Sequence, residues 1–599
     1  MTQKFNKLKN CLIWKFDLRE NLYPLIAFLL FQNIFIGSNA MKFPQMPYVR
    51  PDFEETKVAL TALLERLKAA ATKDECFAVY KEIDEYSKEV WSMFAIARIR
   101  NTLDTNDEFY DKENDYTDEV GPKLEEVQQE ILMALLESPF RKDMEDEWGN
   151  LMFLNAEIEL KTFKPEIIAD LQEENRLESE YGKLIASAQI EFDGKTLTLA
   201  QLHPYYEHPD QKIRESSRRA AANWFISHAG RLDSLYDELV KIRHGIGQKL
   251  GNENFIPVGY NRMQRNCYNE EMVGKFREGV VKHIVPVAQR LKEAQAKRIG
   301  VTELRIYDDG FEYPDGNAKP KGTPDDIFAH GKAMYHELSA ETAEFMDFML
   351  ENELFDILTR PGKKAGGYCS YIPKYKSPFI FANFNGTSGD IDVLTHEAGH
   401  AFAGYVSRDV YPSALSDYSA ETAEVHSMAM EFFTWPWMEG FFGEDTEKYY
   451  YSHLASALTF IPYGTMLDEF QHHMYANPNL TPQQRNDLWL ELEGKYRPWL
   501  NQEDFPFYGE GRRWQAQIHT YLYPFYYIDY CLAQILALSF WAQTQTDFKS
   551  AWAKYRRFVG FGGTKTFLSL IEDSGLPTPF EPENLKAVAT AAVKWLDSK

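Results

Sequence analysis

The amino-acid sequence predicts a mainly α-helical protein with a small β-sheet just before residue 390. Two long regions, about 52–185 and from 420 almost to the end, place apolar residues at the three- and four-residue spacing of amphipathic helices. Between them, residues 378–384 form a short aromatic and β-branched run that is typical of a strand. Hydrophobic residues make up 44% of the 599-residue chain and aromatic residues 15%, which allows a large core.

The first 40 residues differ from the rest and are excluded from the predicted fold. They carry more basic than acidic residues and contain an apolar run, Leu25 to Ile36, that is too short to cross a membrane as a helix. We expect residues 1–40 to be a leader or an upstream extension, with Met41 as the natural start. The alternative is a secretory signal peptide, because Ser38-Asn39-Ala40 has the pattern of a cleavage site.

Helices follow one another in the first part of the fold, and Asp74 is expected to cap the second of them. The expected helices are Glu54–Ala71, Asp74–Arg98, Lys123–Glu137 and Pro165–Ala188. Residues 189–202 then alternate in polarity around Asp193-Gly194, which predicts a β-hairpin. A helical pattern returns over 209–250.

The middle of the chain is expected to be irregular over 303–325 and helical over 324–358. The run Phe379–Phe384 is expected to be a strand. Two interpretations are open: an edge strand that pairs with the backbone of a peptide substrate, or a buried strand with no role in substrate binding. A turn at 386–390 follows, in which Ser388 or Asp390 is expected to cap the next helix.

Charge and cysteine content exclude several classes of protein. The formal net charge of -25 disfavours nucleic acid and anionic membranes as partners, so neither nucleic-acid binding nor stable membrane association is expected. The five cysteines are far apart and form neither a zinc ribbon nor a disulfide scaffold. This pattern fits a reducing compartment and predicts a cytoplasmic protein, or a secreted one if residues 1–40 are a signal peptide.

The strongest functional signal is the run His396-Glu397-Ala398-Gly399-His400. Residues four apart lie on one face of a helix, so the two imidazoles can bind one metal ion. Glu397, next to the first histidine, can then reach a water on that metal. This is the H-E-x-x-H signature of a zinc hydrolase, in which the glutamate is the general base.

A tetrahedral zinc site with an open position needs a third protein ligand, and Glu424 is the best candidate. It lies in a helical pattern far enough downstream for one helix to end and another to begin. Glu431, seven residues later, shares its helix face and is expected to orient a ligating histidine. Glu421 is a weaker alternative, and His426 lies on the opposite side of that helix.

With these residues in place, the sequence resembles the thimet oligopeptidase/oligoendopeptidase F family of zinc metallopeptidases, in its bacterial oligoendopeptidase branch. The matching motifs are His396–His400, Glu424 within Thr422–Val425, the His519 region, Phe384–Asp390 and Pro524–Tyr530, all within about 366–565. One departure is His426, where many members have proline.

The resemblance implies a two-lobed helical shell around a deep substrate channel, one zinc ion per chain and cleavage of short peptides. We expect an N-terminal helical region over 41–200 and a catalytic metallopeptidase domain over 201–599. The alternatives are a zinc exopeptidase of the dipeptidyl carboxypeptidase kind and a catalytically inactive peptide-binding homologue. The intact Glu397 disfavours the inactive homologue.

Hydrolysis also needs a hydrogen-bond donor for the negative charge that develops on the carbonyl oxygen. By resemblance, His519 and a tyrosine near it supply this donor and contact the substrate. The candidates are Tyr523, Tyr526, Tyr527 and Tyr530, and spacing alone does not separate Tyr526 from Tyr527. Pro524 is expected to open the helix that follows. Phe384, Asn385 and Gly386 are expected to bind substrate, whereas Arg512 and Arg513 are expected to be ion-paired.

Overall fold

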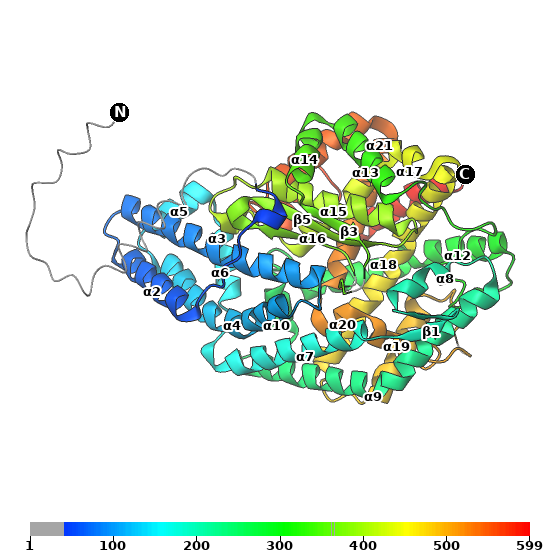
Figure 1. Ribbon diagram of the computed structural model, residues 1–599, viewed down its shortest axis with the longest axis horizontal. Coiled ribbons are helices and arrows are strands. Elements are labelled where there is room, and N and C mark those ends of the chain that lie inside the picture. The colour runs from blue at the N-terminus through cyan, green and yellow to red at the C-terminus, as the bar shows by residue number, and fades with distance from the viewer. Residues whose placement is uncertain (1–40, 361, 365, 503) are drawn as a thin grey trace, which may run out of the picture. The chain divides into compact units, whose positions relative to one another are not determined.

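The described part of the chain is built mainly from helices (Figure 1), and its strands form two small β-sheets. The computed structural model describes residues 41–360, 362–364, 366–502 and 504–599. The predicted leader, residues 1–40, lies outside the described residues. Lys42–Lys599 form one compact unit, and the boundary proposed near residue 200 stays a prediction.

The four predicted helices are present with different ends, and two short helices that were not predicted, Arg141–Trp148 and Leu151–Glu159, lie before the last of them. They are α2 (Phe53–Ala69), α3 (Lys73–Leu103), α4 (Glu108–Glu137), α5 (Arg141–Trp148), α6 (Leu151–Glu159) and α7 (Ile168–Ala186). The predicted cap Asp74 is wrong, because the side chain of Thr72 accepts the hydrogen bond from Glu75 N and Asp74 lies inside α3. Helix α4 begins at Glu108, well before the predicted start at Lys123, and the side chain of Asp107 caps its N-terminus.

The predicted hairpin and the helices after it are also present. Strands β1 (Ile190–Phe192) and β2 (Lys195–Leu197) pair antiparallel around Asp193 and Gly194, both of which have positive φ. The helices that follow are α8 (His203–Tyr206), α9 (Gln211–Lys249), α10 (Ile256–Arg262), α11 (Glu270–His283), α12 (Val285–Ile299), α13 (Pro324–Leu338) and α14 (Ala340–Glu351). The segment between α12 and α13 is irregular, as predicted.

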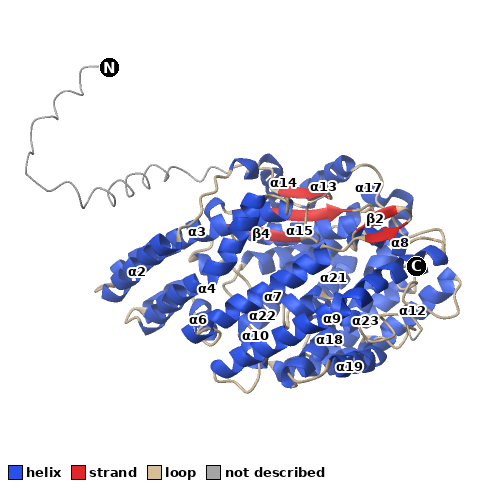
Figure 2. Cartoon of the chain, turned by 60° about the horizontal axis from the view of Figure 1, so that its bottom comes forward, coloured by secondary structure: helices blue, strands red, loops and turns tan. Residues whose placement is uncertain are grey.

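A three-stranded sheet precedes the metal-motif helix in the chain, and its strands are among those drawn red in Figure 2. Its strands are β3 (Phe355–Leu358), β4 (Tyr368–Ile372) and β5 (Ser377–Phe384), in the order β3-β5-β4. The predicted strand at 379–384 is confirmed, but its edge position is wrong, because β5 pairs with β3 on one side and β4 on the other. The helix predicted to reach residue 358 ends at Glu351, and β3 occupies the rest.

The C-terminal part is helical almost to its end, as predicted. Its helices are α15 (Gly389–Val406), α16 (Ala420–Phe433), α17 (Glu439–Phe442), α18 (Thr446–Ala476), α19 (Pro482–Tyr496), α20 (Ile518–Leu522), α21 (Tyr527–Gly560), α22 (Phe567–Asp573) and α23 (Pro582–Leu596). Helix α15 packs on β4, β5, α16 and α21. None of the helices in the described ranges has the length and hydropathy needed to cross a membrane. The predicted fold class, mainly α with a small sheet beside the metal-motif helix, is confirmed.

Candidate metal centre

Helices α15 and α16 approach closely where the metal motif lies. A Cβ added to Gly399 would lie 2.6 Å from Ser427 Cα and 2.7 Å from His426 O, so only glycine allows this approach. The close approach brings a side chain of α16 between the two histidines of α15.

His396, His400 and Glu424 converge as the sequence predicts. Glu424 Oε2 lies 3.3 Å from His396 Nε2 and 3.5 Å from His400 Nε2, and the three ligand atoms lie within 4.8 Å of one another. A tetrahedral zinc ion with bonds of about 2.0–2.1 Å sets neighbouring ligand atoms about 3.3 Å apart. The donor set and its spacing therefore fit zinc.

Glu431 contacts the ring nitrogen of His396 that does not face the other two candidate ligands. Its Oε1 lies 2.7 Å from His396 Nδ1, which leaves His396 Nε2 directed at the other ligands. Its Oε2 lies 2.9 Å from Nε2 of His453, a residue of α18, and Trp435 Nε1 donates to His453 Nδ1. The orienting role predicted for Glu431 matches this geometry, whereas His453 was not foreseen.

Two further groups hold Glu424. The Tyr526 hydroxyl donates to Glu424 Oε1 at 2.6 Å, and the Ser427 hydroxyl donates to Oε2 at 3.0 Å. Burial opposes ionisation of this carboxyl, but His400 and His396 hold its pKa well below its usual range. Glu424 is therefore anionic and held in a fixed orientation, as a metal ligand would need to be.

The predicted base Glu397 is a buried residue of α15, next to His396. It is 7% exposed, and its Oε2 has no hydrogen-bond partner among the described residues. Burial raises the pKa of this carboxyl, and His396 and His400 partly offset the effect. A Cβ added to Gly367, next to β4, would lie 3.6 Å from Glu397 Oε1, so the start of β4 borders the carboxylate.

His519 lies on α20 at the centre of the tyrosine cluster. Its ring centroid lies 5.7 Å from that of Tyr523, 5.9 Å from Tyr526, 4.8 Å from Tyr527 and 5.9 Å from Tyr530. Burial lowers the pKa of His519 to about 4, so the ring is neutral near pH 7. The structure thus brings together all five residues that the sequence singled out here.

The four tyrosines face different neighbours. Burial raises the pKa of Tyr530, and the carboxylates of Glu424 and Glu397 raise it further, whereas a hydrogen bond with Tyr526 lowers it. Tyr527 is surrounded instead by Tyr463, Cys531 and Arg513. Tyr523 is 51% exposed.

The helix expected to open at Pro524 begins later. Helix α21 starts at Tyr527, and Phe525 adopts a φ of 65°, so residues 524–526 form a turn. The side chain of Gln471, on α18, holds this turn: its Nε2 donates to His519 O and its Oε1 accepts from Phe525 N. Gln471 is a positioning residue that the sequence did not reveal.

The loop before α15 has a clear structural role. Asn385 N and Gly386 N both donate to the Asp390 carboxylate at 2.8 Å, and the Phe384 side chain is buried. Ser388 is the N-cap residue but makes no side-chain cap bond. Substrate binding by Phe384, Asn385 and Gly386 stays a prediction.

His426 lies outside the ligand set, as expected from its helix position. It is 1% exposed, and within the described ranges neither ring nitrogen has a hydrogen-bond partner. Burial lowers its pKa to about 3, so it is a neutral core residue between Tyr418 and Phe558.

Comparison with known proteins gives consistent results. The Peptidase M3 N-terminal domain matches residues 43–163, and Peptidase family M3 matches residues 205–590. An oligoendopeptidase F homolog of Lactococcus lactis is 23% identical over 322 residues, 52% of each chain. Group B oligopeptidase PepB of Streptococcus agalactiae is 24% identical over 258 residues, 42% of this chain and 41% of that one. The chain thus spans about half the length of the curated relatives it matches.

The solved structure of PZ peptidase A with an inhibitor superimposes with a TM-score of 0.92 and 47% identity, over 93% of this chain and 99% of that one. The oligoendopeptidase resemblance drawn from the motifs is thereby confirmed. Since residues 205–590 alone are more than half of the sequence, this chain belongs to Peptidase family M3.

Proposed function

We propose that this chain is a zinc-dependent oligoendopeptidase that hydrolyses internal bonds of short, unstructured peptides. The observation that carries the proposal is the set His396, His400 and Glu424, spaced for a tetrahedral metal, with the unpartnered carboxylate of Glu397 beside it. The names of the relatives, an oligoendopeptidase F homolog and an oligopeptidase, support the substrate class.

One zinc ion per chain would be held by His396, His400 and Glu424. When bound, zinc supplies a Lewis acid that lowers the pKa of water to about 7 and polarises a carbonyl. Glu431 keeps His396 oriented, and Tyr526 and Ser427 keep Glu424 oriented. These contacts would hold the three ligand atoms in place around the ion.

Glu397 acts as the general base and then as the general acid. Its free Oε2 accepts the proton of the attacking water and delivers it to the nitrogen of the leaving amine. A raised pKa suits this double role, because the carboxyl has to hold the proton between the two transfers.

His519 and Tyr530 are the proposed donors to the developing oxyanion. The Tyr463 hydroxyl donates to Gln517 Oε1 at 2.8 Å, which directs Gln517 Nε2 at His519 Nδ1, 2.9 Å away. His519 Nδ1 is then an acceptor, so the ring proton resides on Nε2 and is available for donation. Tyr526 is already engaged with Glu424, which favours Tyr530 as the second donor.

The substrate backbone is proposed to lie along β4. This strand is at the edge of its sheet and begins beside Glu397. Pairing through main-chain groups binds extended peptides without reading their side chains. The edge role that the sequence suggested for 379–384 therefore belongs to the neighbouring strand.

A cytoplasmic location is part of the proposal, supported by free cysteines at 76, 267, 369 and 531. An exopeptidase and an inactive peptide-binding homologue are the remaining alternatives. A fluorogenic peptide blocked at both ends separates them, since an obligate exopeptidase needs a free terminus and an inactive homologue cuts nothing.

The decisive experiment is mass mapping of products from such blocked peptides with the zinc-loaded protein, with and without chelator. Internal cleavage that stops with chelator is expected. Glu397→Gln should lower kcat by about 10²–10⁴ with zinc content unchanged, because it removes the base but not a ligand. Exposed Glu447→Gln is the matched control. Full activity of Glu397→Gln would overturn the mechanism.

A further inference from the structure

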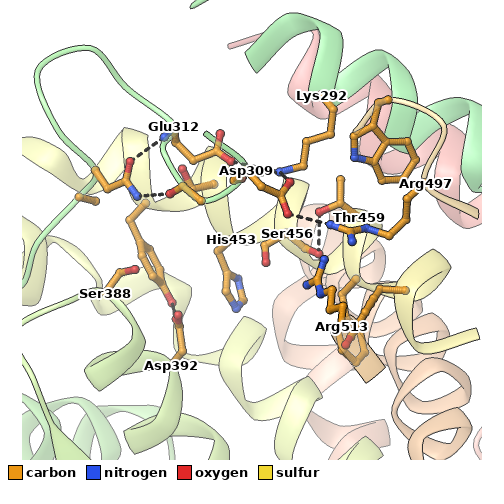
Figure 3. Close-up of a pocket in the computed structure, with 18 residues that line it drawn as sticks. Lys292, Asp309, Glu312, Ser388, Asp392, His453, Ser456, Thr459, Arg497 and Arg513 are labelled. Atoms are coloured by element: carbon orange, nitrogen blue, oxygen red, sulfur yellow. Dashed lines mark hydrogen bonds and ion pairs between the residues drawn. The ribbon is translucent and has the colours of Figure 1, made fainter. Parts of the chain in front are cut away.

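A cavity of about 350 Å³ has Asp392 and His453 in its wall (Figure 3). Its wall comes from α12, the irregular segment after it, the start of α15, one face of α18 and the residues after α19. Asp392 and Ser388 lie on one side, and Arg497 and Arg513 on the other. None of the catalytic roles proposed above uses this space.

Two chains of contacts connect the cavity to the reaction centre. His453 lines it and shares Glu431 with the metal ligand His396. Tyr463 also lines it and reaches His519 through Gln517. Asp392, on the wall, precedes His396 by one helical turn, about 6 Å along the axis of α15. A peptide chain held at the metal therefore has a neighbouring segment within reach of the cavity.

The charges around the cavity leave one cation poorly paired. Asp309 lies 2.8 Å from Arg497 and 3.1 Å from Lys292. Glu312 lies 2.6 Å from Arg298. Glu493 lies 3.3 Å from Arg497 but 3.9 Å from Arg513. Lys292, Arg497 and Arg513 line this side of the cavity with the carboxylates of Asp309 and Glu312, and the shortest ion pair of Arg513, 3.9 Å, is longer than that of Lys292 or Arg497.

Unsatisfied donors occur at the same place. Arg513 Nη1, Trp499 Nε1 and Ser452 Oγ are buried without a hydrogen-bond partner among the described residues, and all three residues line the cavity. Trp499 is 9% exposed. On the opposite side, Asp392 is held by the Tyr449 hydroxyl at 2.7 Å. Buried donors without partners are costly, so a ligand that accepts from them is favoured.

We propose that this cavity is a subsite for a carboxylate of the peptide substrate, bound by Arg513 with help from Trp499 and Ser452. A guanidinium fork matches the two oxygens of a carboxylate. The inference rests on the proposed function. The carboxylate is either the C-terminal carboxylate of the peptide or that of an Asp or Glu side chain.

The test uses the zinc-loaded full chain and pairs of peptides with one cleaved bond. One set, amidated at the C-terminus, carries Glu or Gln at successive positions from the bond. The other set has a free or amidated C-terminus at the same distances. In at least one pair the carboxylate peptide should be cleaved with about tenfold higher kcat/KM. The pair that shows the preference identifies the source of the carboxylate.

Variants assign the preference to the cavity. Arg513→Gln should remove the preference, and Arg513→Lys should restore part of it. Ser456, an exposed residue of α18, also lines the cavity. Ser456→Asp should reverse the preference, because the new carboxylate repels that of the peptide. Ser456→Asn adds a side chain of the same shape without the charge and should keep the preference. The Ser456 pair decides the matter if Arg513→Gln fails to fold.

Equal kcat/KM within every pair, or a preference that survives both Arg513→Gln and Ser456→Asp, would overturn the subsite. Failure of the proposed function gives a different result. In that case the wild-type protein cleaves neither the charged nor the neutral peptides.

Discussion

The Tyr526 hydroxyl donates a 2.6 Å hydrogen bond to Oε1 of Glu424, while Oε2 of the same carboxylate faces both metal-binding histidines. This contact joins the tyrosine cluster at the start of α21 to the ligand set between α15 and α16. It also distinguishes Tyr526 from Tyr527, which sequence spacing could not separate, because the hydrogen bond to Glu424 comes from Tyr526. In the proposed mechanism, Tyr526 orients the ligand Glu424 and Tyr530 donates to the substrate.

Tyr526→Phe and Tyr530→Phe should therefore fail in different ways. Loss of a group that orients a ligand typically lowers metal affinity about 10- to 100-fold, so Tyr526→Phe should bind zinc more weakly and regain kcat in excess zinc. Loss of an oxyanion donor lowers kcat about 10²–10³-fold, so Tyr530→Phe should keep its zinc and lose turnover. Zinc competition with a chelator and steady-state kinetics measure both. Half-exposed Tyr523→Phe is the control, and identical behaviour of the two variants would contradict this division.

Glu431→Gln should weaken zinc binding without removing a ligand. Gln preserves the shape but not the charge that faces His396 Nδ1 and His453 Nε2. The ring of His396 then becomes a poorer ligand, and zinc affinity should fall about 10- to 100-fold. The zinc dissociation constant, set against that of the surface variant Glu439→Gln, checks this. An unchanged zinc dissociation constant would show that Glu431 contributes to packing and not to zinc binding.

Gln517→Glu should reverse the proton position on His519. The amide donates to Nδ1, whereas a carboxylate only accepts, so Nδ1 must then carry the proton. Neutral His519 would lose its Nε2 donor, and kcat should fall by about 10² while KM and zinc content stay near wild type. A raised pKa of His519, followed by NMR of the ring, would accompany the loss, because the new carboxylate stabilises the charged form. Unchanged kinetics would show that the tautomer does not matter.

The metal ligands could be predicted because their geometry is local. His400 is four positions after His396, and Glu431 is seven positions after Glu424, so helix periodicity alone places each pair on one face. The resemblance to a known family added His519 and the tyrosines. The order of the helices could also be predicted, because their apolar periodicity is strong.

Contacts between distant segments could not be predicted. His453 reaches Glu431 from α18, and Gln471 of the same helix holds His519 and Phe525, but no spacing rule connects these segments. The position of β5 within its sheet depends on pairing with β3 and β4, which sequence polarity does not encode. Arg513 was expected to be ion-paired, and the structure shows that its ion pair with Glu493 is a long one, 3.9 Å.

Glu159→Gln should stabilise the protein much more at pH 8 than at pH 5. Burial, together with the nearby carboxyl of Glu125, raises the pKa of Glu159 to about 7, above its value in an unfolded chain. The folded state therefore binds this proton more tightly. The resulting stability is present below about pH 4.5 and is lost as the pH rises through 7, by up to about 3 kcal/mol. Glutamine imitates the protonated carboxyl and avoids that loss. Thermal melts at the two pH values measure the effect, and the exposed Glu166→Gln should match wild type at both. A variant that is equally stabilised at pH 5 would show that the gain comes from packing and not from ionisation.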